Sequence, residues 1–201
     1  MIKKIEVSRG NAKLPRTTAI LNITPALTCP SRAMGVCQLD KCGVGSHKCY
    51  AAKAERAWPE VLPYRVRQQE WWDQDEATLC LGFKGWYDNL RNKVSAVRIG
   101  ESGDFRNAED VGKLRCLAEC NKSLTWYCYT ARQDLFTPKV LEALPANVTV
   151  NGSGWMAHNN FVVLGPRNRD TQAFDHMCPG DCRDCSMCLV PSGKTIGVKP
   201  H

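Results

Sequence analysis

The chain has 201 residues, 43% of them hydrophobic, which suffices for one domain with a full core and barely for two. No apolar run approaches the roughly 20 residues that cross a bilayer, and Met1-Ile2-Lys3-Lys4 does not open the apolar stretch of a secretory signal. The composition therefore disfavours membrane and secreted classes. We expect a single domain over residues 1–201, located in the cytoplasm.

The formal net charge is +7, and the 27 Lys and Arg residues are spread along the chain rather than gathered in a tail. An ordinary basic surface has the same distribution, but six Trp and five Tyr residues could also stack on bases. We expect a nucleic acid or nucleotide as the partner, and no membrane.

The first half of the chain predicts a strand, a cysteine-rich loop and a helical region. Residues 17–24 are rich in β-branched side chains and are closed by Pro25, as is typical of a strand. The cysteine-rich loop covers residues 29–49. From Tyr50 the pattern is helical, breaks at Pro59 and resumes in a Trp- and Gln-rich stretch that ends near Asn92.

The second half alternates strands and helices. Asn107, three residues before Asp110, can cap a helix that carries Val111 to Ala118, and Pro138 lies in the first turn of another at 134–144. Strands are expected at 96–99, 124–129, 148–150 and 161–164. This order is typical of βαβ units around a parallel sheet. The five or six strands predict an α/β fold, either a partial or open (βα) barrel with parallel strands or an open doubly wound sheet.

Polar residues follow the carboxyl ends of these strands, where the active sites of parallel α/β folds collect. Glu101 and Asp104 follow the strand at 96–99, and they are our candidate catalytic residues because two carboxylates with different burial can divide acid and base roles. A helix-capping turn is the alternative. The candidate residues for binding substrate or cofactor are Ser102, Gly103, Thr130, Arg132 and Asn151.

Twelve cysteines in a reducing compartment favour bonds between metal and thiolate over a disulfide framework. One group lies in the loop near the amino-terminal end, where the chain can wrap around a metal centre: Cys29, Cys37, Cys42 and Cys49. Cys49 could instead pack as a small apolar residue.

The second group is tighter and lies near the other end: Cys178, Cys182, Cys185 and Cys188. Four thiols in so short and polar a peptide cannot all pack as hydrophobic side chains, whereas Cys-x-x-Cys steps turn successive thiolates toward one centre. Redox-active thiols are the alternative. Iron–sulfur clusters and zinc share cysteine-only ligation, but the repeated two-residue gap, with only His176 in reach for a mixed site, favours a [4Fe–4S] cluster over Zn²⁺.

The remaining cysteines fall beside apolar residues of predicted helices and a strand: Cys80, Cys116, Cys120 and Cys128. This context favours packing in the core. Cys116 and Cys120, one helical turn apart, could alternatively form a ligand pair.

Several short motifs together resemble the bacteriophage family called gene product 88, over nearly the whole chain. They are Ala12-Lys13-Leu14, Thr28-Cys29-Pro30, Lys48-Cys49-Tyr50-Ala51, Arg98-Ile99-Gly100-Glu101-Ser102-Gly103-Asp104-Phe105, Tyr127-Cys128-Tyr129-Thr130 and the terminal cysteine-rich knot. The resemblance implies a phage-encoded protein that works in the host cytoplasm.

Parts of the pattern also resemble radical S-adenosylmethionine enzymes. These place a cluster loop ending in Cys-Tyr-Ala after the first strand and a Gly-Glu turn after the second, as do Cys49-Tyr50-Ala51 and Gly100-Glu101 here. The resemblance implies a partial barrel, a cluster on three cysteines of the first group, contact of Glu101 with the methionine amino group and an auxiliary cluster at Cys178 to Cys188. The family's usual spacing of three and then two residues between cysteines is absent from the first loop and occurs at Cys178, Cys182 and Cys185.

Guanine transglycosylases are a second partial resemblance. Their Asp-Ser-Gly-Gly-Phe turn is similar to residues 101–105, and they carry a zinc site of closely spaced cysteines. The resemblance implies exchange of guanine in DNA for a deazaguanine, with Glu101 or Asp104 as base or nucleophile. The hypotheses are thus a radical-type cluster enzyme that modifies a base or nucleotide, a zinc-containing transglycosylase, and a non-enzymatic module that binds nucleic acid or a host protein.

Overall fold

A computed structural model describes residues 5–41, 49–165 and 174–199 of the chain. Within them an open sheet of eight strands has the order β1-β2-β3-β4-β5-β6-β8-β7, and every neighbouring pair is parallel except β1 with β2. The strands are β1 (Ser8–Arg9), β2 (Thr18–Leu21), β3 (Ala96–Ile99), β4 (Thr125–Thr130), β5 (Val148–Ser153), β6 (Asn159–Val163), β7 (His176–Met177) and β8 (Thr195–Val198).

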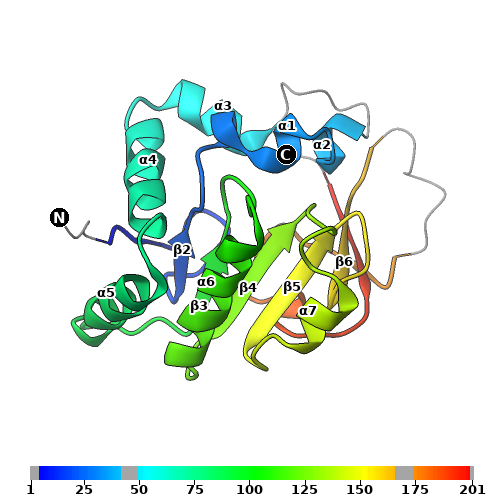
Figure 1. The fold of residues 1–201 in the computed structure, drawn as a ribbon. Coiled ribbons are helices and arrows are strands. Elements are labelled where there is room, and N and C mark those ends of the chain that lie inside the picture. The colour runs from blue at the N-terminus through cyan, green and yellow to red at the C-terminus, as the bar shows by residue number, and fades with distance from the viewer. Residues whose placement is uncertain (1–4, 42–48, 166–173, 200–201) are drawn as a thin grey trace.

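Helices fill the connections between the strands (Figure 1). Those between β2 and β3 are the 3-10 turn η1 (Ala26–Thr28), α1 (Pro30–Ala33), α2 (Gln38–Lys41), α3 (Tyr50–Ala57), α4 (Val61–Trp72) and α5 (Glu76–Asp88). Later in the chain follow α6 (Ala108–Cys120), α7 (Pro138–Glu142) and the 3-10 turn η3 (Met187–Leu189). Figure 1 shows α1, α2 and α3 above the ends toward which the strands point.

The α/β class and the mostly parallel, open sheet are confirmed, and the strand count is larger than expected. Strands β1, β7 and β8 were not predicted from the sequence. β1 and β7 have two residues each, too few to show alternation. The helical stretch after Pro59 is divided as well. Asp75 accepts a hydrogen bond from the amide of Thr78 and so caps a separate helix, α5.

The outer face of the sheet packs against helices and forms the main core. Alternate residues of β3 and β4, such as Val97 and Trp126, lie in register and are fully buried beneath α5 and α6. Phe83 from α5 packs on Trp126 with ring centroids 4.9 Å apart. Asn107 caps α6 by accepting from the amide of Asp110, as predicted.

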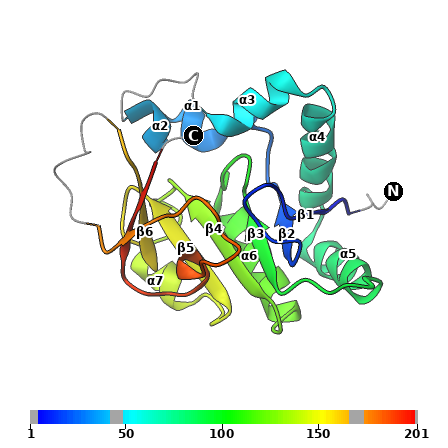
Figure 2. The same cartoon turned by 180° about the vertical axis from the view of Figure 1, so that it is seen from behind.

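The inner face carries the alternate side chains of each strand and is more polar. Arg98, Tyr127 and Tyr129 alternate with the core residues, so they stand on the opposite side of the sheet. Figure 2 shows the carboxy-terminal segment running across this face, behind the sheet in Figure 1. The parallel strands therefore separate a helix-covered side from a side that can hold a site.

Of the helices in the described part of the chain, none combines the length and the apolar character needed to span a bilayer.

Candidate functional site

A cavity of about 880 Å³ lies on the inner face of the sheet, a volume typical of ligand-binding pockets. Cysteines of both predicted groups line it: Cys29, Cys37, Cys49, Cys178, Cys182, Cys185 and Cys188. Cys42 lies outside the described residues. Two cysteine groups separated by more than a hundred residues of sequence therefore line the same cavity.

The first group is held by short helical turns after β2. Cys29 stands between η1 and α1, Cys49 directly precedes α3, and the amide of Cys37 donates to the carbonyl of Ser31 at 3.2 Å. Burial, with a smaller contribution from the nearby Asp104, raises the pKa of Cys29 to about 12. A metal that binds here must displace a proton from a thiol, because the thiolate is the ligand.

Gln38 joins this loop to the far side of the cavity. Its side-chain amide donates to Ser153 Oγ at 2.8 Å and to the carbonyl of Phe161 at 2.6 Å, and its carbonyl accepts from the amide of Val163 at 2.9 Å. The residue beside Cys37 is thus bonded to the ends of β5 and β6. This bridge holds α2 over the cavity.

The second group is fastened to the inner face by asparagines. Asn151 of β5 donates to the carbonyl of Cys188 at 3.0 Å, and Asn159 of β6 donates to Asn151 Oδ1 at 3.0 Å. Thr149 Oγ1 donates to the carbonyl of Leu189 at 2.9 Å. Asn151, predicted to bind substrate or cofactor, here positions a cysteine.

The four thiols of the second group lie close enough to affect one another. Burial and the other three cysteines of the group together raise the pKa of Cys188 to about 11, against a hydrogen bond with Tyr129 that lowers it. Cys185 Sγ lies 3.7 Å from His176 Nε2. The segment predicted from the Cys-x-x-Cys spacing therefore has its thiols near one another, with Cys188 beside Tyr129.

Glu101 lines the cavity at the carboxyl end of β3. Asn11 Nδ2 donates to Glu101 Oε1 at 2.6 Å, and the hydroxyl of Tyr50 donates to the Glu101 carbonyl at 2.6 Å. Arg98 Nη2 donates in turn to the Tyr50 hydroxyl at 3.2 Å. The Tyr50 hydroxyl thus joins the Arg98 guanidinium to the backbone of Glu101.

Asp104, the second candidate catalytic residue, also borders the cavity but is only 5% exposed. Its carboxylate accepts hydrogen bonds from Ser31 Oγ, Thr130 Oγ1 and the amides of Phe105 and Ala131. Burial raises its pKa, and these four donors oppose the rise. Asp104 thereby ties the first cysteine loop to the end of β4.

Three further candidates are buried and bonded to protein groups rather than placed on the cavity wall. Ser102 donates its amide to Asn22 Oδ1 at 2.6 Å, and Thr130 bonds Asp104. Arg132 pairs with Asp134 and donates to the carbonyls of Phe105 and Arg106. Their roles in binding a ligand stay predictions.

Gly103 does line the cavity, with φ +77°. A Cβ at this position would overlap Thr24, so the turn accepts no other residue without moving.

Arg98 was not among the site residues predicted from the sequence. Its guanidinium lies 5.1 Å from the ring centroid of Tyr129, and Tyr129 meets Phe161 edge to face at 4.7 Å. Arg98 Nε is buried and has no hydrogen-bond partner among the described residues. An arginine inside the apolar strand Ala-Val-Arg-Ile was the signal that could have identified it.

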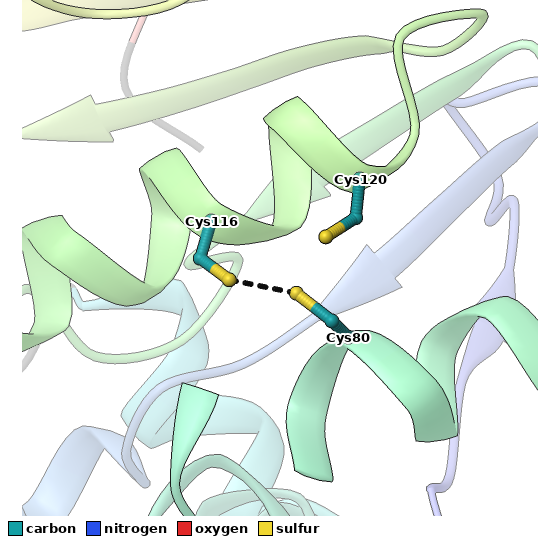
Figure 3. Close-up of side chains that lie close together, drawn as sticks. All are labelled: Cys80, Cys116 and Cys120. Atoms are coloured by element: carbon teal, nitrogen blue, oxygen red, sulfur yellow. Dashed lines mark hydrogen bonds between the residues drawn. The ribbon is translucent and has the colours of Figure 1, made fainter. Parts of the chain in front are cut away.

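A third cysteine group lies on the outer side of the sheet (Figure 3). The Sγ atoms of Cys80, Cys116 and Cys120 all lie within 4.8 Å of one another, a spacing that could hold a metal ion. The sequence favoured core packing for these three and for Cys128. Cys128 is fully buried in the core, whereas the other three face one another.

The fold and the cavity define an α/β protein with an open, mostly parallel sheet and a cysteine-lined pocket on its inner face. The chain belongs to the gene product 88 family, because the family model described as Gene product 88 matches residues 5–178. The resemblance of its motifs to that phage family is thereby confirmed. No curated protein and no solved structure matches the chain.

Proposed function

We propose that this protein is an iron–sulfur enzyme that uses S-adenosylmethionine to modify a nucleotide or a nucleic-acid base in the cavity. The observation that carries the proposal is the convergence of both cysteine groups, Glu101 and Arg98 on one cavity of about 880 Å³. A [4Fe–4S] cluster would supply one-electron chemistry there. The protein residues bind and orient the reactants and exclude water.

The spacing of the cavity thiols supports a cluster over a single zinc ion. Zn–S bonds of about 2.3 Å place tetrahedral thiolates about 3.8 Å apart. Among the described residues, no three of the cavity cysteines have their Sγ atoms within 4.8 Å of one another. In an iron–sulfur cluster the thiolates bind different irons, so a wider spacing fits.

The ligands would divide between the two groups. Three of Cys29, Cys37, Cys42 and Cys49 would hold the cluster that works on the methionine cofactor. Cys178, Cys182, Cys185 and Cys188 would hold an auxiliary cluster against Tyr129, where the asparagines of β5 and β6 fix the segment.

Glu101 and Arg98 are suited to an amino-acid group, which carries an ammonium and a carboxylate. The Glu101 carboxylate would bind the ammonium and the Arg98 guanidinium the carboxylate, with Tyr50 bonded to both residues. Arg98 Nε, buried without a partner in the described part of the chain, is a donor that a ligand carboxylate would satisfy.

The aromatic side chains of the cavity wall support a base or nucleotide as the substrate. Tyr127, Tyr129 and Phe161 line the same cavity, and their rings can stack on a base. The net charge of +7 favours a polyanionic partner.

The test is metal analysis of protein purified without oxygen. We expect iron and acid-labile sulfide, with a brown colour and absorption at about 400 nm. The double variant Cys29→Ser/Cys49→Ser should lose part of the iron, and Cys182→Ser/Cys185→Ser another part. Cys128→Ala removes a buried cysteine outside the cavity and serves as the matched control that keeps all of it.

A colourless protein with zinc on the cavity cysteines would overturn the proposal. It would leave a transglycosylase-like enzyme or a binding module with structural zinc. Glu101→Gln separates these two, because it should abolish base exchange in DNA but leave the affinity of a binding module nearly unchanged.

A further inference from the structure

The seam between α5 and α6 brings three thiols together far from the cavity. Cys80 comes from α5, and Cys116 and Cys120 lie one turn apart on α6, all pointing toward one another (Figure 3). Cys80 Sγ lies 2.8 Å from Cys116 Sγ, and the three Sγ atoms lie within 4.8 Å of one another. These helices cover the outer face of the sheet, so the sheet separates this group from the inner cavity.

The arrangement fits one ion better than it fits packing or a disulfide. A tetrahedral zinc ion needs thiolates about 3.8 Å apart, which lies between the 2.8 Å that separates Cys80 Sγ from Cys116 Sγ and the 4.8 Å limit for all three, so zinc would require those two thiols to move apart. A disulfide would use two of the thiols and give the third no role. Packing of thiols in the core does not explain why the exposed Cys120 faces the same point as the buried Cys80.

A candidate fourth ligand lies one helical turn from the thiols, although its carboxylate is not among the ligand atoms that lie within 4.8 Å of one another. Glu76 lies one turn before Cys80 on α5, and its Oε1 sits over Gly112, which lies one turn before Cys116 on α6. A Cβ at Gly112 would come within 2.9 Å of that oxygen, so the glycine leaves the space that the carboxylate occupies. Each helix thus presents two positions one turn apart, and one of the four is Glu76.

The three cysteines differ in solvent exposure, so an ion could enter from solvent at one end of the group and bind at the buried end. Cys80 is buried, Cys116 is half-buried and Cys120 is exposed. Burial and hydrogen bonds with the other two thiols raise the pKa of Cys80. Binding of a cation would release the thiol protons.

We propose that Cys80, Cys116 and Cys120, with the carboxylate of Glu76, bind Zn²⁺ and fasten α5 to α6 on the outer face of the sheet. Three thiolates select a soft divalent cation, and zinc adds no redox chemistry to a site whose role is to join two helices. The site is independent of the chemistry proposed for the cavity.

The experiment uses the full chain and measures each cysteine separately, because cavity thiols stripped of their cluster by the chelator could also take up added Zn²⁺. Reduced, chelator-treated protein is alkylated with iodoacetamide with and without added Zn²⁺, and each cysteine is quantified by peptide mass mapping. We expect zinc to slow the alkylation of Cys116 and Cys120 in the wild type. Cys120→Ser, at an exposed position, should lose about one zinc equivalent per chain and the protection of Cys116.

Two further variants test the fourth ligand and provide a control. Glu76→Gln should weaken the protection without changing the reactivity of the metal-free protein. Cys128→Ala, which removes a core cysteine on the same side of the sheet, should keep both the zinc and the protection. Unchanged alkylation of Cys116 and Cys120 with zinc, or a Cys80–Cys116 disulfide in protein purified without oxygen, would overturn the proposal.

Discussion

Arg65 Nη1 donates to Glu55 Oε1 at 2.8 Å, and both side chains are almost inaccessible to solvent. The same carboxylate accepts from the amide of Ala26 at 2.7 Å and from Ser102 Oγ at 3.3 Å. This ion pair therefore links α3 and α4 to the start of the first cysteine loop and to the turn after β3.

Removing the charge of Glu55 should destabilise the whole protein. Glu55→Gln leaves Arg65 as a buried charge without a counter-ion, which typically lowers the free energy of unfolding by about 3–5 kcal/mol. Asp88→Asn breaks only the exposed pair with Lys84 and should lower the free energy of unfolding far less. Urea unfolding of both variants checks the prediction, and equal effects would contradict it.

Removing the guanidinium of Arg98 should weaken the binding of S-adenosylmethionine. A hydrogen bond to a charged group contributes about 1.5–3 kcal/mol, so Arg98→Met should raise the Kd by about 10- to 150-fold, and Arg98→Lys by less. Arg91→Gln, at an exposed arginine outside the cavity lining, is the control. Isothermal titration of cluster-loaded protein measures the Kd, and an unchanged value for Arg98→Met would rule out this role.

The stability contributed by Asp110 should be lost in acid. Burial alone would raise its pKa, but hydrogen bonds from Arg106 and Trp72 outweigh burial and hold the pKa below the ordinary value. A lowered folded-state pKa stabilises the protein above the unfolded value of about 3.9, and this contribution fades as the pH falls through the folded-state pKa.

Asp110→Asn should therefore be less stable than the wild type at pH 7, and the difference should shrink below about pH 4. Urea unfolding at several pH values measures it. A difference that stays constant down to pH 3 would show that Asp110 does not titrate as inferred.

Much of the fold followed from local signals. The apolar run at Ala96–Ile99, the Asn107 cap and Pro138 at the start of α7 predicted elements that the structure contains. Local signals failed where pairing alone makes a strand. His176 and Met177 are in a strand only because β8 lies beside them.

Local signals also decided which cysteine groups could be predicted from the sequence and which could not. Cys178 to Cys188 are close in sequence, so their spacing showed that they could share a centre. Cys80 lies 36 residues from Cys116, and no pattern in the chain joins them. Their meeting depends on how α5 packs on α6, which is decided by the core beneath both helices.

By itself, the sequence determined the α/β class, the family and the two cysteine-rich segments, because periodicity, motifs and short spacings are local properties. Only the tertiary structure decided that both segments line one cavity, that Arg98 and Glu101 line the same cavity and that three other thiols meet between two helices. These relationships arise from long-range packing and strand order, which no window of the chain contains.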